Sequence, residues 1–377
     1  MAYTTVDDPT QYFNTVLFTG DIEDSDGTGH DQAVTGVGFQ PNWIWHKCRS
    51  HANQHIWVDS VRGTGGSPTQ MLGISSQDAN AEVSANTNGF IESIDSDGFT
   101  VTSGNDSSSK SNNAGANGRT YVDWCWKAGT TISSTSTSGS GTAKTYTGSV
   151  STTAGFSIIR YVGNQTAGHT IPHHLGAKPD AILVKHLGDG QQWATQWSPL
   201  GATKVMRFAT TNAVSDSNTR WNDTEPSTSV FTLGNEAEGN TNDGNHIAYC
   251  FTSIKGYSKI GSYTGNATGG NEGPFIYTGF KPAWIMIKNA SAGSTDWYIY
   301  DNKRGGPAAT VYGNNNKFFL KANTGVAEAN ETFDMYSNGF KIRITNNFLN
   351  GDGNTLIYMA FAESPFVSSN KIPTTAR

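Results

Sequence analysis

One group of four short motifs occurs three times along the chain in the same order, and this repetition limits the possible folds more than any other feature. In each copy an aromatic residue precedes a glycine by two positions, and a proline precedes a lysine by six. A segment centred on Phe follows, and an aromatic-rich segment closes the copy. The proline-to-lysine segments are 41–47, 179–185 and 282–288, and the closing segments are 121–126, 247–251 and 356–361. The pattern predicts three copies of one structural unit.

Each copy has the local pattern of β-structure. Short apolar and aromatic runs alternate with Gly, Asn and Asp turn residues, and no stretch keeps a helical period. Each repeated proline opens its strand, where the missing N–H costs little. Aromatic residues make up 11% of the chain, more than one open sheet per unit can bury. The sequence therefore predicts an all-β fold of three tandem β-sandwich repeats, similar to jelly rolls in size.

Composition marks the boundaries that we expect between these repeats. The three repeats are expected at residues 15–128, 154–255 and 256–363. Residues 129–153 are rich in Gly, Ser and Thr, which is typical of a flexible linker. An N-terminal segment, 1–14, and a C-terminal tail, 364–377, lie outside the repeats.

The charge and the apolar runs exclude several classes of protein. No run of 18 apolar residues occurs, so no membrane insertion is expected. The formal net charge is -6 and no Lys/Arg tract occurs, which excludes nucleic acid as a partner. The N-terminus lacks the basic and apolar regions of a secretory leader. Cys48, Cys125 and Cys250 are too few for a disulfide framework and are expected to be free thiols, as in a cytoplasm.

Two groups of residues are conceivable metal ligands. His169, His173 and His174 form a cluster, but Pro172 prevents the helix that would align the first two, so a polar loop is the favoured interpretation. A second group precedes Gly27 at a spacing loosely like a calcium loop, although its order does not match the EF-hand pattern. Its members are Asp21, Glu23, Asp24 and Asp26. A solvated turn is favoured there over a weak cation site, and neither a metal nor another cofactor is predicted.

Charged residues at repeat-equivalent positions favour architecture over catalysis. Asp59 and Asp301 each shortly precede an Arg-Gly pair, and we expect structural carboxylate–arginine contacts there. The repeated lysines are expected to extend from strand ends into solvent; they are Lys47, Lys185 and Lys288. No nucleophile elbow, phosphate loop or zinc-protease motif occurs. The chain is therefore not expected to be an enzyme, and a polysaccharide-degrading tail enzyme remains a remote alternative.

The aromatic residues divide into an expected core and expected loops. Tryptophans in predicted strands are assigned to the core: Trp43, Trp124, Trp126 and Trp284. Trp197, Trp221 and Tyr312 fall in predicted loops and are the better ligand candidates, although no receptor-binding residue is assigned.

Several longer segments resemble a known family. They are Met-Ala-Tyr-Thr-Thr-Val-Asp-Asp-Pro (1–9), Tyr-Ser-Lys-Ile-Gly-Ser-Tyr-Thr-Gly (257–265), Leu-Ile-Tyr-Met-Ala-Phe-Ala-Glu (356–363) and Ile-Pro-Thr-Thr-Ala-Arg (372–377). These segments are similar to three-repeat virion structural or tail fibre-like proteins of marine tailed phages, of the cyanophage and pelagiphage type. The resemblance covers essentially the whole chain. It implies a virion component and brings no catalytic residues.

The repeats and the resemblance together predict a virion structural protein, assembled in the host cytoplasm. We expect a tail fibre or fibre-like adhesin that binds a host surface glycan or protein, with many weak contacts combined into avidity. A capsid decoration or cement protein is the alternative. Other virion proteins are expected partners, and a homo-oligomer, with a trimer favoured, is expected.

The N-terminal segment is the predicted attachment point. It precedes every repeat motif, and with no repeat of its own to pack into it is expected to lie on another subunit, where its apolar side chains leave water. The predicted attachment residues are Tyr3, Val6, Pro9, Tyr12 and Phe13.

Overall fold

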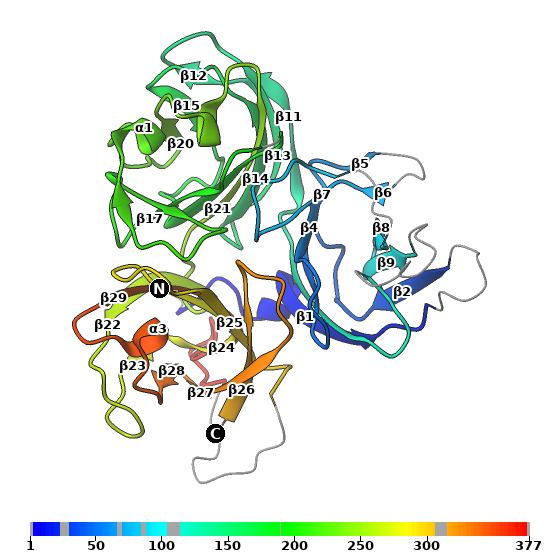
Figure 1. Cartoon of the computed structure of the whole chain (residues 1–377), viewed down its shortest axis with the longest axis vertical. Helices are drawn as coiled ribbons and strands as arrows, with labels where there is room; N and C mark the ends of the chain where they lie inside the picture. Colours follow the sequence, from blue (N-terminus) through cyan, green and yellow to red (C-terminus); the bar gives the residue numbers. More distant parts are fainter. Residues whose placement is uncertain are drawn as a thin grey trace.

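The computed structural model confirms an all-β fold of roughly three sheet-pair units (Figure 1). It describes residues 3–22, 30–65, 70–83, 88–103, 114–188, 190–305 and 315–374. The units, called units 1, 2 and 3 below, span 13–126, 130–251 and 258–365, and they surround a common centre rather than lying in a row. A short 3-10 helix, η1 (Pro9–Gln11), precedes unit 1.

Unit 1 has a five-stranded inner sheet and a three-stranded outer sheet. The inner strands, in sheet order, are β1 (Phe13–Thr19), β10 (Thr120–Trp126), β3 (Trp43–Cys48), β4 (Ile56–Asp59) and β7 (Gly73–Ile74). The outer strands are β2 (Asp31–Thr35), β9 (Gly98–Thr102) and β8 (Phe90–Asp95). A small hairpin is formed by β5 (Thr64–Gly65) and β6 (Gln70–Met71).

Unit 2 has an eight-stranded inner sheet, a small outer sheet and two short helices. The inner strands, in sheet order, are β11 (Thr130–Ser136), β13 (Thr145–Ser151), β14 (Phe156–Val162), β21 (Asn245–Phe251), β16 (Ala181–His186), β17 (Ala194–Trp197), β18 (Lys204–Arg207) and β19 (Ser215–Asp216). The outer strands are β12 (Ser138–Gly139), β15 (His169–Pro172) and β20 (Val230–Leu233), and the helices are α1 (Asn218–Trp221) and α2 (Ala237–Asn240).

The structure corrects the expected flexible linker at residues 129–153. This stretch forms β11, β12 and β13, and β13 pairs with β14 from Tyr146 to Ser151. The physical reason lies in two apolar residues spaced by four, Tyr146 and Val150, which face the same side of a strand and are buried in the core of unit 2. A Ser/Thr-rich composition is compatible with an edge hairpin when such residues anchor one face.

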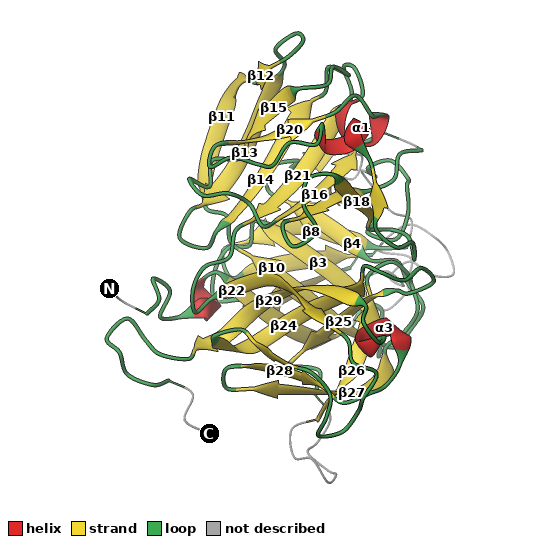
Figure 2. Ribbon diagram, turned by 90° about the vertical axis from the view of Figure 1, so that its left-hand side faces the viewer, coloured by secondary structure: helices red, strands yellow, loops and turns green. Residues whose placement is uncertain are grey.

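Unit 3 has one curled sheet in which both layers are continuous (Figure 2). Its strands, in order, are β22 (Ser258–Thr264), β29 (Thr355–Pro365), β24 (Phe280–Asn289), β25 (Trp297–Asp301), β26 (Asn315–Lys321), β27 (Ala329–Tyr336), β28 (Gly339–Ile342) and β23 (Phe275–Tyr277). The short helix α3 (Asn347–Asn350) precedes β29. The two edge strands of this sheet, β22 and β23, approach each other, because Lys259 Nζ donates to the carbonyl of Tyr277 at 2.7 Å.

The three inner sheets share one strand order and one register. The orders β1-β10-β3-β4, β14-β21-β16-β17 and β22-β29-β24-β25 are equivalent. The repeated lysines lie opposite Val122, Ile247 and Ile357, which occupy the same position in the three closing strands. The register therefore places Lys47, Lys185 and Lys288 at equivalent sites, as the repeated motifs predict.

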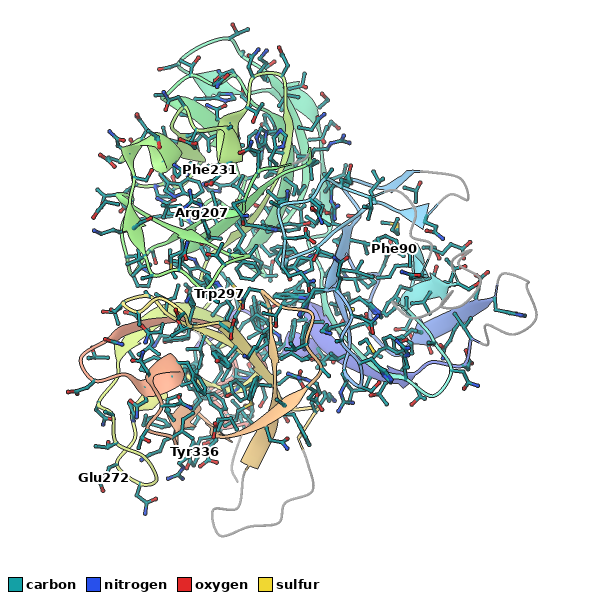
Figure 3. All side chains as sticks on the ribbon, in the orientation of Figure 1. Phe90, Arg207, Phe231, Glu272, Trp297 and Tyr336 are labelled. Carbon is teal, nitrogen blue, oxygen red and sulfur yellow. The ribbon has the colours of Figure 1, made fainter. Side chains whose placement is uncertain are left out.

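The inner faces of all three sheets pack into one shared core. Nine of the ten tryptophans lie in this cluster, and they come from all three units (Figure 3 labels Trp297 where units 2 and 3 meet). They are Trp43, Trp45, Trp57, Trp124, Trp126, Trp193, Trp197, Trp284 and Trp297. Each unit also has its own smaller core between its inner and outer layers. The predicted core role of Trp43, Trp124, Trp126 and Trp284 is thus confirmed.

Candidate functional site

The three repeated lysines lie in buried sockets made of main-chain carbonyl groups. Each side chain is fully buried. Within its own unit, Lys47 Nζ donates to Asn53 O at 2.8 Å, Lys185 Nζ to His186 O at 2.7 Å and Lys288 Nζ to Thr295 O at 2.5 Å. The prediction that these lysines extend into solvent is therefore wrong, because the carbonyls of the following loop supply enough acceptors to hold a desolvated ammonium group.

Each lysine also reaches a loop of a neighbouring unit. Lys47 donates to Gly325 O of unit 3 at 3.0 Å, Lys185 to Ala79 O of unit 1 at 3.3 Å and Lys288 to Thr211 O of unit 2 at 3.3 Å. The three contacts thus run in a cycle, in which every unit donates one lysine and accepts another. Burial lowers the pKa of Lys47 and of Lys288 to about 8.

Backbone hydrogen bonds repeat the same cycle two residues after each lysine. Leu187 O accepts from Glu82 N, Arg49 O from Glu328 N, and Ala290 O from Val214 N, at 3.0, 2.9 and 2.8 Å. Each of these bonds joins two units. Together with the lysine contacts they give the molecule a pseudo-threefold axis that passes through the shared core.

The predicted carboxylate–arginine pairs are confirmed in units 1 and 3. Arg62 Nε lies 2.5 Å from Asp59 Oδ2, and Arg304 Nε lies 2.6 Å from Asp301 Oδ2, with all four side chains fully buried. Each arginine also contacts a second carboxylate, Glu82 or Glu328, at 3.2 and 3.1 Å. The second carboxylate and a main-chain carbonyl also accept hydrogen bonds from each guanidinium group. The buried positive charge is therefore paired within its own unit.

These two clusters also join neighbouring units. Tyr249 of unit 2 donates its hydroxyl to Asp59 Oδ2 at 2.8 Å, and Trp124 of unit 1 donates its indole N–H to Asp301 Oδ2 at 2.9 Å. The third boundary lies between units 2 and 3. There the strand register places Trp197 at the position of the aspartate and Met359 at the position of the donor. Both of these side chains are buried in the shared core. Apolar side chains therefore occupy the positions of the polar pair at one boundary of three.

The histidine cluster serves local structure. His169 bonds Asn240 Oδ1 at 3.1 Å and Thr137 Oγ1 at 2.7 Å, and His174 bonds the Tyr146 hydroxyl at 2.9 Å. His173 accepts from the backbone N–H of Leu175. Burial lowers the pKa of all three histidines, that of His173 to about 4. Within the described residues, no group of three or more His, Cys, Asp or Glu side chains is arranged to hold a metal ion.

Other sequence candidates are placed as follows. Trp197 and Trp221 were predicted in loops, but they lie in β17 and α1 and are buried, so they are not ligand platforms. Tyr312 and the acidic residues Glu23, Asp24 and Asp26 lie outside the described residues. The three cysteines are buried free thiols, as predicted.

The N-terminal segment packs on its own chain, which corrects the premise of its predicted role. Val6, Pro9 and Phe13 are buried, and Val6 and Phe13 belong to the shared core. Tyr12 packs edge-on against Tyr257, with ring centroids 6.1 Å apart. The segment also contacts the C-terminal tail, where Ser369 N donates to Asp7 Oδ1 at 2.6 Å. Tyr3 and Tyr12 are half-buried, and Tyr3 lies at the surface of unit 3, where its hydroxyl donates to Gly279 O at 2.7 Å.

That surface carries a row of aromatic rings along the outer layer of unit 3. We call this row, made of Tyr336, Phe275, Tyr277 and Tyr3, the β23 strip. Phe275 and Tyr277 are 47% and 50% exposed, the only aromatic side chains among the exposed large hydrophobics of the described residues. Phe275 meets Tyr336 edge-on at 5.9 Å, and the hydroxyls of Tyr277 and Tyr3 are 3.4 Å apart. No sequence motif indicated this strip, because the aromatic residues of β23 do not recur in the other units.

Comparison with known proteins gives one finding. A family model described as a domain of unknown function (DUF7483) matches residues 8–365, which is most of the chain. No curated protein and no solved structure matches. In the part of the chain that the structure describes, no helix is long and apolar enough to cross a membrane.

Proposed function

The chain belongs to the DUF7483 family, and we propose that it is a structural protein of a phage virion, a tail fibre or fibre-like adhesin that binds the host surface. The resemblance of its terminal and closing segments to marine tailed-phage proteins supports the virion assignment. The observation that carries a scaffold role is the cyclic set of contacts between the units. The repeated buried charges, Lys47, Lys185, Lys288, Asp59 and Asp301, all hold one unit to another.

A body of this kind suits an adhesin because it presents loops and edges from a rigid centre. Three units locked around one core leave the outer layers facing away from the axis (Figure 1). Weak contacts from such surfaces become strong when many copies act together on one particle. The partners in this proposal are other virion proteins and a host glycan or protein, in a homo-oligomer for which a trimer is favoured.

The capsid decoration role is the second candidate, and one observation favours it. The two terminal segments lie side by side on one side of the molecule (Figure 2), joined by the contact between Asp7 and Ser369. A single face that carries both terminal segments suits a protein that sits on a shell lattice.

Particle localisation tests the proposal and separates the two roles. Antibodies raised against the purified chain are labelled with gold and applied to purified virions. Label on the tail supports the fibre or adhesin, and label spread over the capsid supports decoration. If the protein is absent from purified particles, the virion assignment is wrong.

A further inference from the structure

Comparison of the three units shows that the fold does not require the aromatic residues of the β23 strip. In each outer layer a buried residue pairs across strands with the repeated phenylalanine. These pairs are Ile276 with Phe340, Val34 with Phe99 and Ile171 with Phe231. On this alignment Phe275 corresponds to Ala33 and Thr170, and Tyr277 corresponds to Thr35 and Pro172. Units 1 and 2 thus build the same layer with small side chains at the two outward positions. The exposed rings of unit 3 therefore need a reason other than folding.

The strip is flanked by positive charge, although the whole chain is acidic. Lys255 Nζ lies 4.6 Å from the centroid of the Tyr3 ring, and Lys259 Nζ lies 5.6 Å from that of Tyr277. Lys341 is the cross-strand partner of Phe275. Among the described residues, none of these three lysines forms an ion pair with a carboxylate. This group of cations lies on a chain whose formal net charge is -6.

The shape of the strip narrows the kind of ligand. Phe275 and Tyr277 project from the same face of an extended strand, about 6.6 Å apart along it. Tyr336 meets the Phe275 ring from β27, on the far side of β28, and the Tyr3 hydroxyl lies beside that of Tyr277. The strip therefore offers several neighbouring apolar ring faces, with phenol hydroxyls on both sides of Phe275 to bond polar groups. Rings spread in this way suit a polymer, which can contact several of them at once.

The charge and the aromatic rings of the strip then distinguish between a nucleic acid and a polysaccharide as the ligand. Three lysines on an acidic protein are too few for a nucleic acid, whose affinity depends on many phosphate contacts. A polysaccharide with carboxylate groups offers the required combination of apolar ring faces, hydroxyl groups and spaced negative charges. We propose that the β23 strip binds an acidic polysaccharide, with the rings of Phe275 and Tyr277 stacked on its sugars and Lys255 and Lys259 beside its carboxylates. This inference rests on the proposed adhesin function and names the class of receptor.

The test uses the full chain and polygalacturonate, with dextran as the neutral polymer, in affinity gel electrophoresis. We expect polygalacturonate to retard the wild-type protein more than dextran does. The double variant F275A/Y277A should bind polygalacturonate about tenfold more weakly, which corresponds to ~1.4 kcal/mol. The double variant K255A/K259A should lose the preference for polygalacturonate over dextran. Because these side chains are partly exposed, thermal unfolding should confirm that both variants fold.

The matched control is Thr35→Ala, which truncates the unit 1 equivalent of Tyr277 and should leave binding unchanged. The proposal is overturned if polygalacturonate does not retard the wild-type chain, or if F275A/Y277A binds as well as wild type. It is also overturned if size-exclusion chromatography shows a self-association that F275A/Y277A abolishes, because the strip would then be a contact between copies. Gold labelling of particles does not depend on these results. If the protein is found on virions but does not bind polygalacturonate, only the proposed binding at the β23 strip is wrong.

Discussion

At the residue scale, main-chain carbonyl groups hold the three repeated lysines inside the protein. Lys47, Lys185 and Lys288 end apolar strands, a position at which lysine normally guards an edge in water. The carbonyls that bury them belong partly to Ala79, Gly325 and Thr211, which share no residue type. Main-chain acceptors leave no mark in the sequence. The lysine positions were therefore predictable, but their partners were not.

The buried lysines predict an unusual dependence of stability on pH. The pKa of Lys288 is about 8 in the folded protein, below its ordinary value of 10.5. Between these values the unfolded chain binds more protons than the folded one, so the contribution of Lys288 to stability rises with pH in that window. We expect the stability difference between wild type and Lys288→Met to grow from pH 8 to pH 10 in urea titrations.

The wild type and the Lys288→Met variant share all other titratable groups. Subtracting their stabilities therefore cancels the contribution of groups with the opposite pH dependence. Burial raises the pKa of Cys125 and, to about 12, that of Cys250, and their contribution falls as pH rises through the ordinary thiol range. A difference that is flat with pH would show that the ammonium of Lys288 is as well stabilised in its socket as in water.

The buried aspartates predict a large loss of folding stability when one of them is replaced by asparagine. Replacing Asp301 by Asn keeps the shape but leaves Arg304 without its closest counter-charge in a fully buried site. Loss of one partner of a buried pair costs about 3–5 kcal/mol. We expect Asp301→Asn to lower the free energy of unfolding by that amount, measured by urea denaturation. Asp59→Asn should have a similar effect, because its cluster is equivalent.

The matched control is an exposed pair. Asp216 forms an ion pair with Lys204 at the surface, and Asp216→Asn should cost below about 1 kcal/mol. Equal effects of Asp301→Asn and Asp216→Asn would contradict a role of the buried clusters in joining the units.

At the element scale, the ordered motifs indicated that the three units share one arrangement of strands. They did not indicate the hairpin of β11 and β13. Ser and Thr dominate this segment, as they do many linkers, because a strand with one solvated face needs few apolar residues. Tyr146 and Val150, spaced by four, were the available signal. The outer aromatic strip was unpredictable for the opposite reason. Phe275 and Tyr277 alternate with Ile276 in a pattern that fits a strand buried on both faces as well as an exposed edge.

The hairpin predicts that residues 130–151 contribute to the stability of unit 2. Replacing Tyr146 and Val150 by Ser removes two side chains from its core, each worth about 1.5–3 kcal/mol when buried. We expect the double variant to unfold at a clearly lower temperature in differential scanning fluorimetry. As a control, Thr131→Gly and Ser134→Gly alter exposed residues of β11 and should have a smaller effect. An unchanged melting temperature for Y146S/V150S would restore the linker interpretation.

At the scale of the whole molecule, three repeats in sequence have become one body in space. Isolated sandwiches joined by linkers would each bury their own core and unfold separately. Here the inner sheet of every unit packs on the other two, and the N-terminal segment adds Val6 to the same cluster. Each sandwich removed from this arrangement would expose the inner face of its sheet to water, including tryptophans whose replacement by alanine typically costs about 3–5 kcal/mol.

This arrangement predicts cooperative unfolding of the whole chain and failure of its parts. The full chain should unfold in a single calorimetric transition, with coincident loss of tryptophan fluorescence and β-sheet circular dichroism. Unit 3 expressed alone, as residues 256–365, should not fold, because Trp284, Trp297 and Phe361 would lie on an exposed apolar face. A chain cut once in an exposed turn but still containing all three units provides the control, since its shared core is complete. Two or more separate transitions, or a stable isolated unit 3, would show that the common core adds little to the stability of each sandwich.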